Sequence, residues 1–254
     1  MNTNWSREEH ILAFNLYCKI PFTKINAKYQ PVKDLARILG RTDGSVAMKL
    51  ANFARLDPVL KARNVSGLTR GAKGEEDIWN EFNEDWNNLG YESEKILARY
   101  KGVSIEESAG IDIEGIPAEG KEREATVKVR VNHNFFSNTV RASYEFKCCI
   151  TGLKVPDLLV AGHIKPWAKD LKNGTNPSNG LCINALHDRA FENGLITVTP
   201  DYIIKVSEAL IHKLPKPEED VFFIPYQDKK IILPKRFLPS KEFLEWHGSV
   251  KFKK

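Results

Sequence analysis

The chain has 254 residues, 42% of them hydrophobic, with 38 basic and 33 acidic side chains. This is enough apolar material for one large or two modest cores, and no stretch approaches the roughly 18 apolar residues that cross a bilayer. Four cysteines do not make a disulfide framework in a chain of this length, and no basic start leads into an apolar run as in a signal peptide. We therefore expect a cytoplasmic protein.

The charge is distributed unevenly along the chain. Residues 1–70 carry twelve basic and five acidic side chains, residues 71–125 carry six and fifteen, and residues 126–254 carry twenty and thirteen. Two basic segments thus flank an acidic one. Basic segments favour nucleic-acid binding because they displace counterions from phosphates, although ordinary solvated surfaces can be equally basic.

The first 60 residues show the pattern of three helices. Ser6, with Glu9 three residues later, predicts a capped helix start. A second helix is expected after Pro31, and Thr42 is expected to cap a third one after a turn at Gly40. The apolar residues of the third helix have the spacing of a buried face: Val46, Leu50 and Phe53.

Two helices joined by a short glycine-containing turn form the helix-turn-helix pattern, whose last helix enters the major groove of DNA. On this interpretation Ser45, Lys49 and Asn52 face DNA, with Arg41 in the preceding turn. Lysine suits a phosphate or guanine, and asparagine suits an adenine edge. Residues 5–88 also resemble winged-helix-type domains, with residues 59–69 as the expected wing. A helical bundle that binds nothing is the alternative.

The acidic segment is expected to be a linker. It shows little apolar periodicity, and its second half is rich in turn-forming glycine and proline. We therefore divide the chain into a helical domain at residues 1–90, a linker at 91–121 and a second domain at 122–254. At the start of the second domain, Val127–Asn132 is expected to form a strand and Phe135–Tyr144 a helix.

Residues 159–197 carry the pattern on which the second domain depends. Their apolar runs and turn signals predict a strand, a polar loop, a second strand and a helix. His163 stands just past the end of the first strand, Asn179 lies in the loop, and His187 lies in the helix, which is expected over Asn184–Asn193. A hairpin is expected next, over residues 195–206.

These three polar residues suit metal-assisted attack on a phosphodiester. A neutral His163 can take a proton from water, because the ordinary pKa of histidine lies near neutral pH. A divalent ion near His187 can stabilise charge on the phosphate. The amide of Asn179 can bond backbone groups across the loop. The alternative is that the two histidines have purely structural roles. The occurrence of His163, Asn179 and His187 in this order and setting makes that alternative less favourable.

This string resembles the HNH endonucleases, whose ββα-metal motif carries a histidine, an asparagine and a second histidine in this order. Flanking blocks such as Cys149–Gly152 resemble a subfamily of bacterial restriction enzymes, and the resemblance covers about residues 122–206. It implies an α+β fold, with His163 as general base, Asn179 as orienting residue and His187 as ligand of Mg²⁺ or Mn²⁺. It also implies cleavage of double-stranded DNA in restriction or defence.

The sequence departs from the family pattern immediately before the general base. Gly162 stands where many HNH enzymes have an Asp or His that binds the metal. The nearest carboxylates, Asp188 and Glu192, are therefore expected to join His187 as ligands, with water and phosphate oxygens completing the shell.

Two basic residues beside the motif are candidate DNA contacts. Arg189 suits a bidentate phosphate contact or, equally, a salt bridge with a neighbouring carboxylate, and Lys165 lies just after the first strand. The N-terminal domain is expected to select a sequence or a modified base, and a homodimer is plausible for a double-strand break. An RNA-cleaving or nicking enzyme and a non-catalytic DNA-binding regulator are the alternatives.

Overall fold

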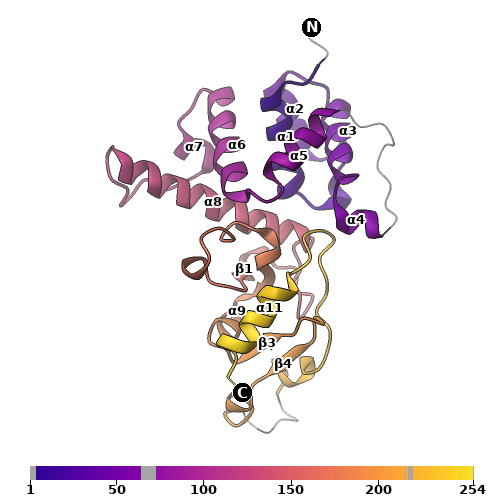
Figure 1. The fold of residues 1–254 in the computed structure, drawn as a ribbon, viewed down its shortest axis with the longest axis vertical. Helices are drawn as coiled ribbons and strands as arrows, with labels where there is room; N and C mark the ends of the chain where they lie inside the picture. The colour runs from indigo at the N-terminus through magenta and orange to yellow at the C-terminus, as the bar shows by residue number, and fades with distance from the viewer. Residues whose placement is uncertain (1–3, 64–72, 215, 217–219, 254) are drawn as a thin grey trace.

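The structure, a computed structural model, describes residues 4–63, 73–214, 216 and 220–253. It is an α+β fold in which helices make up the first part and two small antiparallel sheets follow (Figure 1). None of the helices described is long and apolar enough to cross a membrane. The helices are α1 (Arg7–Lys19), α2 (Gln30–Leu39), α3 (Asp43–Ala54), α4 (Pro58–Ala62), α5 (Lys73–Phe82), α6 (Trp86–Lys101), α7 (Ile105–Ala109), α8 (Lys121–Ser143), α9 (Ala185–Glu192), α10 (Glu208–Ile211) and α11 (Lys241–Trp246). The strands are β1 (Leu159–His163), β2 (Gly180–Asn184), β3 (Ile196–Val198) and β4 (Ile204–Val206).

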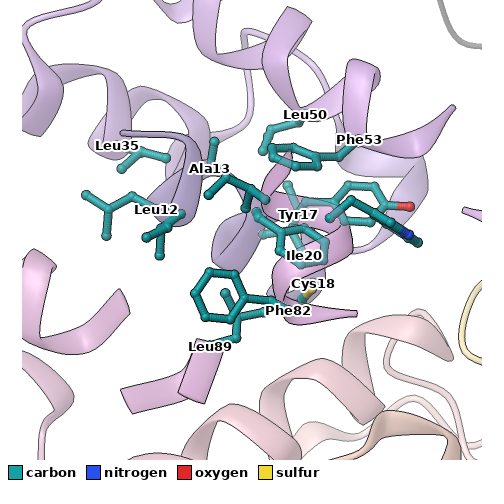
Figure 2. Close-up of a cluster of buried hydrophobic side chains, with 14 of the residues drawn as sticks. Leu12, Ala13, Tyr17, Cys18, Ile20, Leu35, Leu50, Phe53, Phe82 and Leu89 are labelled. Carbon is teal, nitrogen blue, oxygen red and sulfur yellow. The ribbon is translucent and has the colours of Figure 1, made fainter. Parts of the chain in front are cut away.

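Helix α1 is the centre of the helical part. Ser6 and Glu9 form the predicted capping box at its start, and the helix packs against α2, α3, α5, α6 and α8. Figure 2 shows the core that results, in which Tyr17 of α1 lies near Phe53 of α3, with ring centroids 6.2 Å apart. Burial of these aromatic rings stabilises the bundle because each removes a large apolar area from water.

The turn between α2 and α3 is the one expected from the sequence. Gly40 adopts a left-handed conformation with φ of 62°, which glycine reaches without steric cost, and ends α2. Thr42 then caps α3 by accepting a hydrogen bond from the main-chain N–H of Ser45 at 3.2 Å. Of the expected wing at residues 59–69, residues up to Ala62 belong to α4, and those from 64 onward lie outside the described residues.

The expected linker is largely helical, and in this respect the prediction was wrong. Helix α6 buries Leu89 and Ile96 in the core of the helical part, and α7 packs against both α6 and α8. Charged residues separate the few apolar positions of this segment, so its periodicity is weak, and tertiary packing rather than propensity holds it as a helix. Within the expected linker, only residues 102–104 and 110–120 lie outside helices.

Helix α8 joins the two parts of the molecule (Figure 1). It packs against α1, α6 and α7 on one side and against β1 and β2 on the other. The strand expected over residues 127–132 is part of this helix; Val127 and Val131 are four residues apart and are buried together. Phe135 belongs to the helical core and Phe136 to the core of the C-terminal part. One helix therefore contributes to both cores.

The two strands and the helix expected from residues 159–197 are confirmed. β1 and β2 pair antiparallel, with His163 opposite Gly180, and α9 follows β2 directly. Asn184, the last residue of β2, caps α9 through its side chain. The expected hairpin is formed by β3 and β4. Because Asn184 pairs with Leu159, α9 starts beside the first residue of β1, and the helix packs against both strands.

The C-terminal segment returns to the helical part. Arg236 is fully buried, and its guanidinium donates hydrogen bonds to the main-chain carbonyls of Tyr17, Cys18 and Ile20 at the end of α1. It also lies 4.4 Å from the centroid of the Tyr17 ring. The next residue, Phe237, belongs to the helical core. The last carbonyls of α1, which lack partners within the helix, are satisfied in this way.

Candidate active site

A pocket of about 510 Å³ lies where the end of β1, helix α9 and the C-terminal residues meet. It contains most of the polar side chains that the sequence predicts for the site, together with aromatic and basic residues from other elements. The lining residues with polar or charged side chains are His133, His163, Trp167, Asp188, Arg189, Glu192, Asn193, His247 and Lys251.

His163 is half-buried and is held in one orientation. Its Nε2 lies 2.8 Å from the main-chain carbonyl of Gly174 and donates to it, which leaves Nδ1 as the acceptor. The imidazole stacks on Phe136 with ring centroids 3.9 Å apart and an angle of 6° between the planes. Burial lowers the pKa of His163, and the bond to Gly174 offsets this only in part. The ring is therefore neutral near neutral pH, as a general base requires.

Asn179 is fully buried and makes the backbone contacts predicted for it. Its Oδ1 accepts from the N–H of Lys165 at 2.8 Å, and its Nδ2 donates to the carbonyls of Lys165 and Asn173 at 2.9 and 3.1 Å. The main-chain N–H of Ile164 also donates to the Asn179 carbonyl at 2.9 Å. Asn179 thus ties the residues that follow His163 to the far end of the loop.

Asp188 occupies the space beside Gly162. A Cβ atom at position 162 would collide with Asp188 Oδ1, so the glycine admits the carboxylate. Among the described residues, this buried oxygen has no hydrogen-bond partner. Burial, together with the nearby charge of Glu192, raises the pKa of the Asp188 carboxyl to about 6. An unpartnered carboxylate oxygen in a polar pocket is costly and indicates a missing cation or donor.

These residues fit a divalent cation that binds through oxygen atoms. Glu192 lies one turn after Asp188 on α9 and lines the same pocket, so one helix offers two carboxylates. No group of three or more His, Cys, Asp or Glu side chains that could hold a metal occurs in the part of the chain that the structure describes.

His187 lies outside this pocket, contrary to its expected role as a metal ligand. It is buried, with Nδ1 3.0 Å from Asn184 Oδ1 and Nε2 2.7 Å from the carbonyl of Phe222. It lines a separate, mostly apolar pocket. Successive residues of a helix differ by about 100° in direction, so α9 directs Asp188 toward His163 and turns His187 toward the opposite side. Its contacts are those of a structural residue.

Two of the residues expected to face DNA on α3 are turned into the protein. Lys49 and Asn52 are buried, and both bond Glu75 of α5: Lys49 through an ion pair and Asn52 through Nδ2 at 3.0 Å. Helix α5 packs on the face of α3 that the sequence suggested was exposed. The predicted DNA contacts at Lys49 and Asn52 are corrected accordingly, because a buried and paired lysine cannot reach a phosphate.

The other predicted DNA contacts are at least partly accessible, and most are engaged within the protein. Arg41 pairs with Glu9 at 2.7 Å and Lys165 with Asp170 at 3.0 Å, and Ser45 is half-buried in the first turn of α3. Arg189 differs from these, because 78% of its side chain is exposed and its contact with Glu192 is long, at 3.5 Å. Of the predicted basic contacts, Arg189 is the one that lines the pocket of His163.

Sequence reasoning missed several residues of the pocket. His133 lies three residues before Phe136, so the helical spacing of α8 places both near His163, and this spacing was the available signal. Gly174 belongs to the Asn173–Gly174 turn signal, but nothing in the sequence indicates that its carbonyl bonds His163. Lys251 comes from the C-terminal residues and bonds the carbonyl of Glu192 at 3.0 Å.

The strands β1 and β2, the loop between them and helix α9 form a ββα arrangement in which a neutral histidine and two helix-borne carboxylates line one pocket. Residues 148–199, which include these elements, match the model of the HNH endonuclease family. This segment is therefore similar to the HNH endonucleases, a family that implies action on nucleic acid. No curated protein matches the chain closely enough to count as a relative.

Proposed function

We propose that the protein is a metal-dependent endonuclease that hydrolyses phosphodiester bonds in double-stranded DNA. One observation carries the proposal: His163, with Nδ1 left as an acceptor, and Asp188, with an unpartnered buried oxygen, line the same pocket. A base beside a cation-binding carboxylate is what hydrolysis of a phosphodiester by water requires.

His163 would act as the general base. Its Nδ1 takes a proton from the attacking water, and the resulting imidazolium keeps its Nε2–H bond to the Gly174 carbonyl, which stabilises the positive charge. The stacked ring of Phe136 prevents the imidazole from turning away. Asn179 would hold the loop that provides this geometry.

Asp188 and Glu192 would hold Mg²⁺ or Mn²⁺ with oxygen ligands. When bound, such a cation stabilises negative charge on the phosphate and on the leaving oxygen. Arg189 is exposed beside the two carboxylates and would contact a phosphate through its guanidinium. Lys251 lines the same pocket and would add positive charge toward the DNA backbone.

The proposal extends to the biological setting. The sequence resemblance supports a restriction or defence enzyme whose N-terminal part selects a sequence or a modified base. The turn at Gly40 and the capped helix α3 are consistent with a helix-turn-helix reader. With Lys49 and Asn52 buried, such a reader would depend on other residues, including Ser45. Cutting both strands in one event would take two copies of the chain, which supports a homodimer on DNA.

The test is cleavage of supercoiled plasmid grown with and without base modification, in Mg²⁺ or Mn²⁺. We expect the wild type to cut and His163→Ala and Asp188→Asn to be at least about 100-fold slower. Nicked circles as the final product would show a nicking enzyme, and cutting of RNA alone would show an RNA nuclease. Equal behaviour of wild type and His163→Ala on every substrate would refute the proposal.

A further inference from the structure

The loop that bonds His163 is held from the helical part of the molecule. Asn87, in the first turn of α6, donates from Nδ2 to the main-chain carbonyls of Leu171 and Lys172 at 3.2 and 3.3 Å. Its Oδ1 accepts from the hydroxyl of Thr175 at 2.7 Å. Thr175 is fully buried. One side chain of α6 therefore bonds the loop at three points.

These three points lie on either side of Gly174, the residue whose carbonyl accepts from His163. The position of Gly174 is further restricted by Trp167, because a Cβ atom at 174 would collide with the indole ring. On the other side, Asn179 bonds the carbonyl of Asn173. The loop is thus fixed from within by Asn179 and from the helical part by Asn87.

A pocket lies at the seam between this loop and the helical part. Next to Asn87, this pocket of about 460 Å³ is lined by Trp79 of α5 and the following Asn83 together with Lys172 and Asn173 of the loop. Satisfied polar bonds that span such a seam make it more rigid. The bonds of Asn87 lie at this seam.

We infer that Asn87 is a positioning residue for His163: through residues 171–175 it fixes the Gly174 carbonyl and thereby keeps the proton of His163 on Nε2. When that carbonyl moves away, Nε2–H loses its acceptor, and the imidazole distributes its proton between both nitrogens. The fraction of His163 with Nδ1 ready to accept a proton then falls. The helical part is in this way required for a competent nuclease site. The effect on cleavage rests on the proposed function, whereas the tautomer of His163 does not.

The direct test is nuclear magnetic resonance of the full-length protein with labelled histidine, which reports the tautomer of His163. We expect the wild type to hold the proton on Nε2, and Asn87→Ala to show a mixture of both tautomers. Thr175→Val, which keeps the shape but removes the hydroxyl, is expected to give a smaller change in the same direction. Asn88→Ala is the matched control, because Asn88 is exposed and bonds only Asp85 in its own turn among the contacts described.

Cleavage kinetics provide a second readout. In Asn87→Ala we expect kcat to fall about 10- to 100-fold with KM for DNA unchanged, because a small misplacement of a catalytic group affects the chemical step. Adding Asn87→Ala to His163→Ala is expected to have no further effect. A folded Asn87→Ala or Thr175→Val protein with the wild-type tautomer would overturn the inference. If the tautomer changes and yet the wild type cleaves nothing, the proposed function fails and the inference stands.

Discussion

Asp188 Oδ1 fills the space that a side chain at position 162 would take, so Gly162 and Asp188 form a complementary pair. In the family pattern that the sequence resembles, the residue before the general base supplies a metal ligand. Here the strand has no side chain at that point, and the carboxylate comes from the facing helix α9 instead. The negative charge thus stays beside His163 although it is attached to a different element.

We predict that Asp188→Asn stabilises the metal-free protein while abolishing cleavage. The pKa of Asp188 is about 6 in the folded protein against an ordinary value of 3.8, so the folded state binds its proton more tightly than the unfolded state does. The contribution of Asp188 to the free energy of unfolding therefore falls as pH rises between these values and stays low above them. Asparagine removes this cost. Because Asp188 is only half-buried, we expect a gain on the order of 1 kcal/mol.

Thermal unfolding in EDTA at pH 7.5 and at pH 4.5 checks this prediction. The gain should be present at pH 7.5 and should shrink at pH 4.5, where wild-type Asp188 is itself largely protonated. Added Mg²⁺ should raise the melting temperature of the wild type but not of the variant. A variant less stable than wild type at pH 7.5 would contradict the account.

The dependence of cleavage on pH should show a metal-sensitive acidic limb. Below about pH 6 the Asp188 carboxyl takes up a proton and loses affinity for the cation. Burial lowers the pKa of His163 below its ordinary value, so protonation of the base requires a lower pH than for an exposed histidine. Raising the Mg²⁺ concentration should move the midpoint of the limb to lower pH, because the cation competes with the proton at Asp188. A midpoint independent of Mg²⁺ would argue against Asp188 as a ligand.

His187→Ala should affect stability rather than metal binding. The imidazole is buried between Asn184 and the carbonyl of Phe222, so its removal leaves a cavity and an unpaired polar group. We expect a loss of about 2–4 kcal/mol in the free energy of unfolding. Calorimetric titration of the folded variant with Mn²⁺ should give a dissociation constant close to that of the wild type. A loss of Mn²⁺ binding by the folded protein would restore His187 as a ligand.

Lys49 and Glu75 should behave as a buried pair. Lys49→Met leaves the Glu75 carboxylate buried without its cationic partner, and we expect a loss of about 3–5 kcal/mol in the free energy of unfolding. The double variant Lys49→Met/Glu75→Gln removes both charges and should recover most of this loss, as urea unfolding would show. If Lys49→Met were as stable as the wild type but bound DNA more weakly, the lysine would face DNA after all.

The elements governed by local chemistry were predictable from the sequence. The capping box at Ser6, the turn at Gly40, and the two strands and helix of the nuclease module all follow from residues close together in the chain. The contacts of Asn179 belong to the same class, because its loop partners lie within 14 residues of it. Short-range hydrogen bonding and apolar periodicity determine such features.

The features missed depend on contacts between distant segments. Which face of α9 meets β1 decides whether His187 or Asp188 enters the pocket of His163. A difference of one residue along the helix turns a side chain by about 100°. The burial of Lys49 depends on α5, which supplies Glu75 from 26 residues later. The bonds of Asn87 to the loop cross more than 80 residues. No local pattern contains this information.

Arg236 has a consequence for synthesis of the chain on the ribosome. The carbonyls that it bonds at the end of α1 precede it by 216 to 219 residues. At roughly 5–20 residues per second, the nascent helical part waits on the order of ten seconds or longer for this arginine. A chain released after residue 199 but before residue 236 would carry the complete HNH motif. The carbonyls at the end of its first helix would still lack the hydrogen bonds that Arg236 donates.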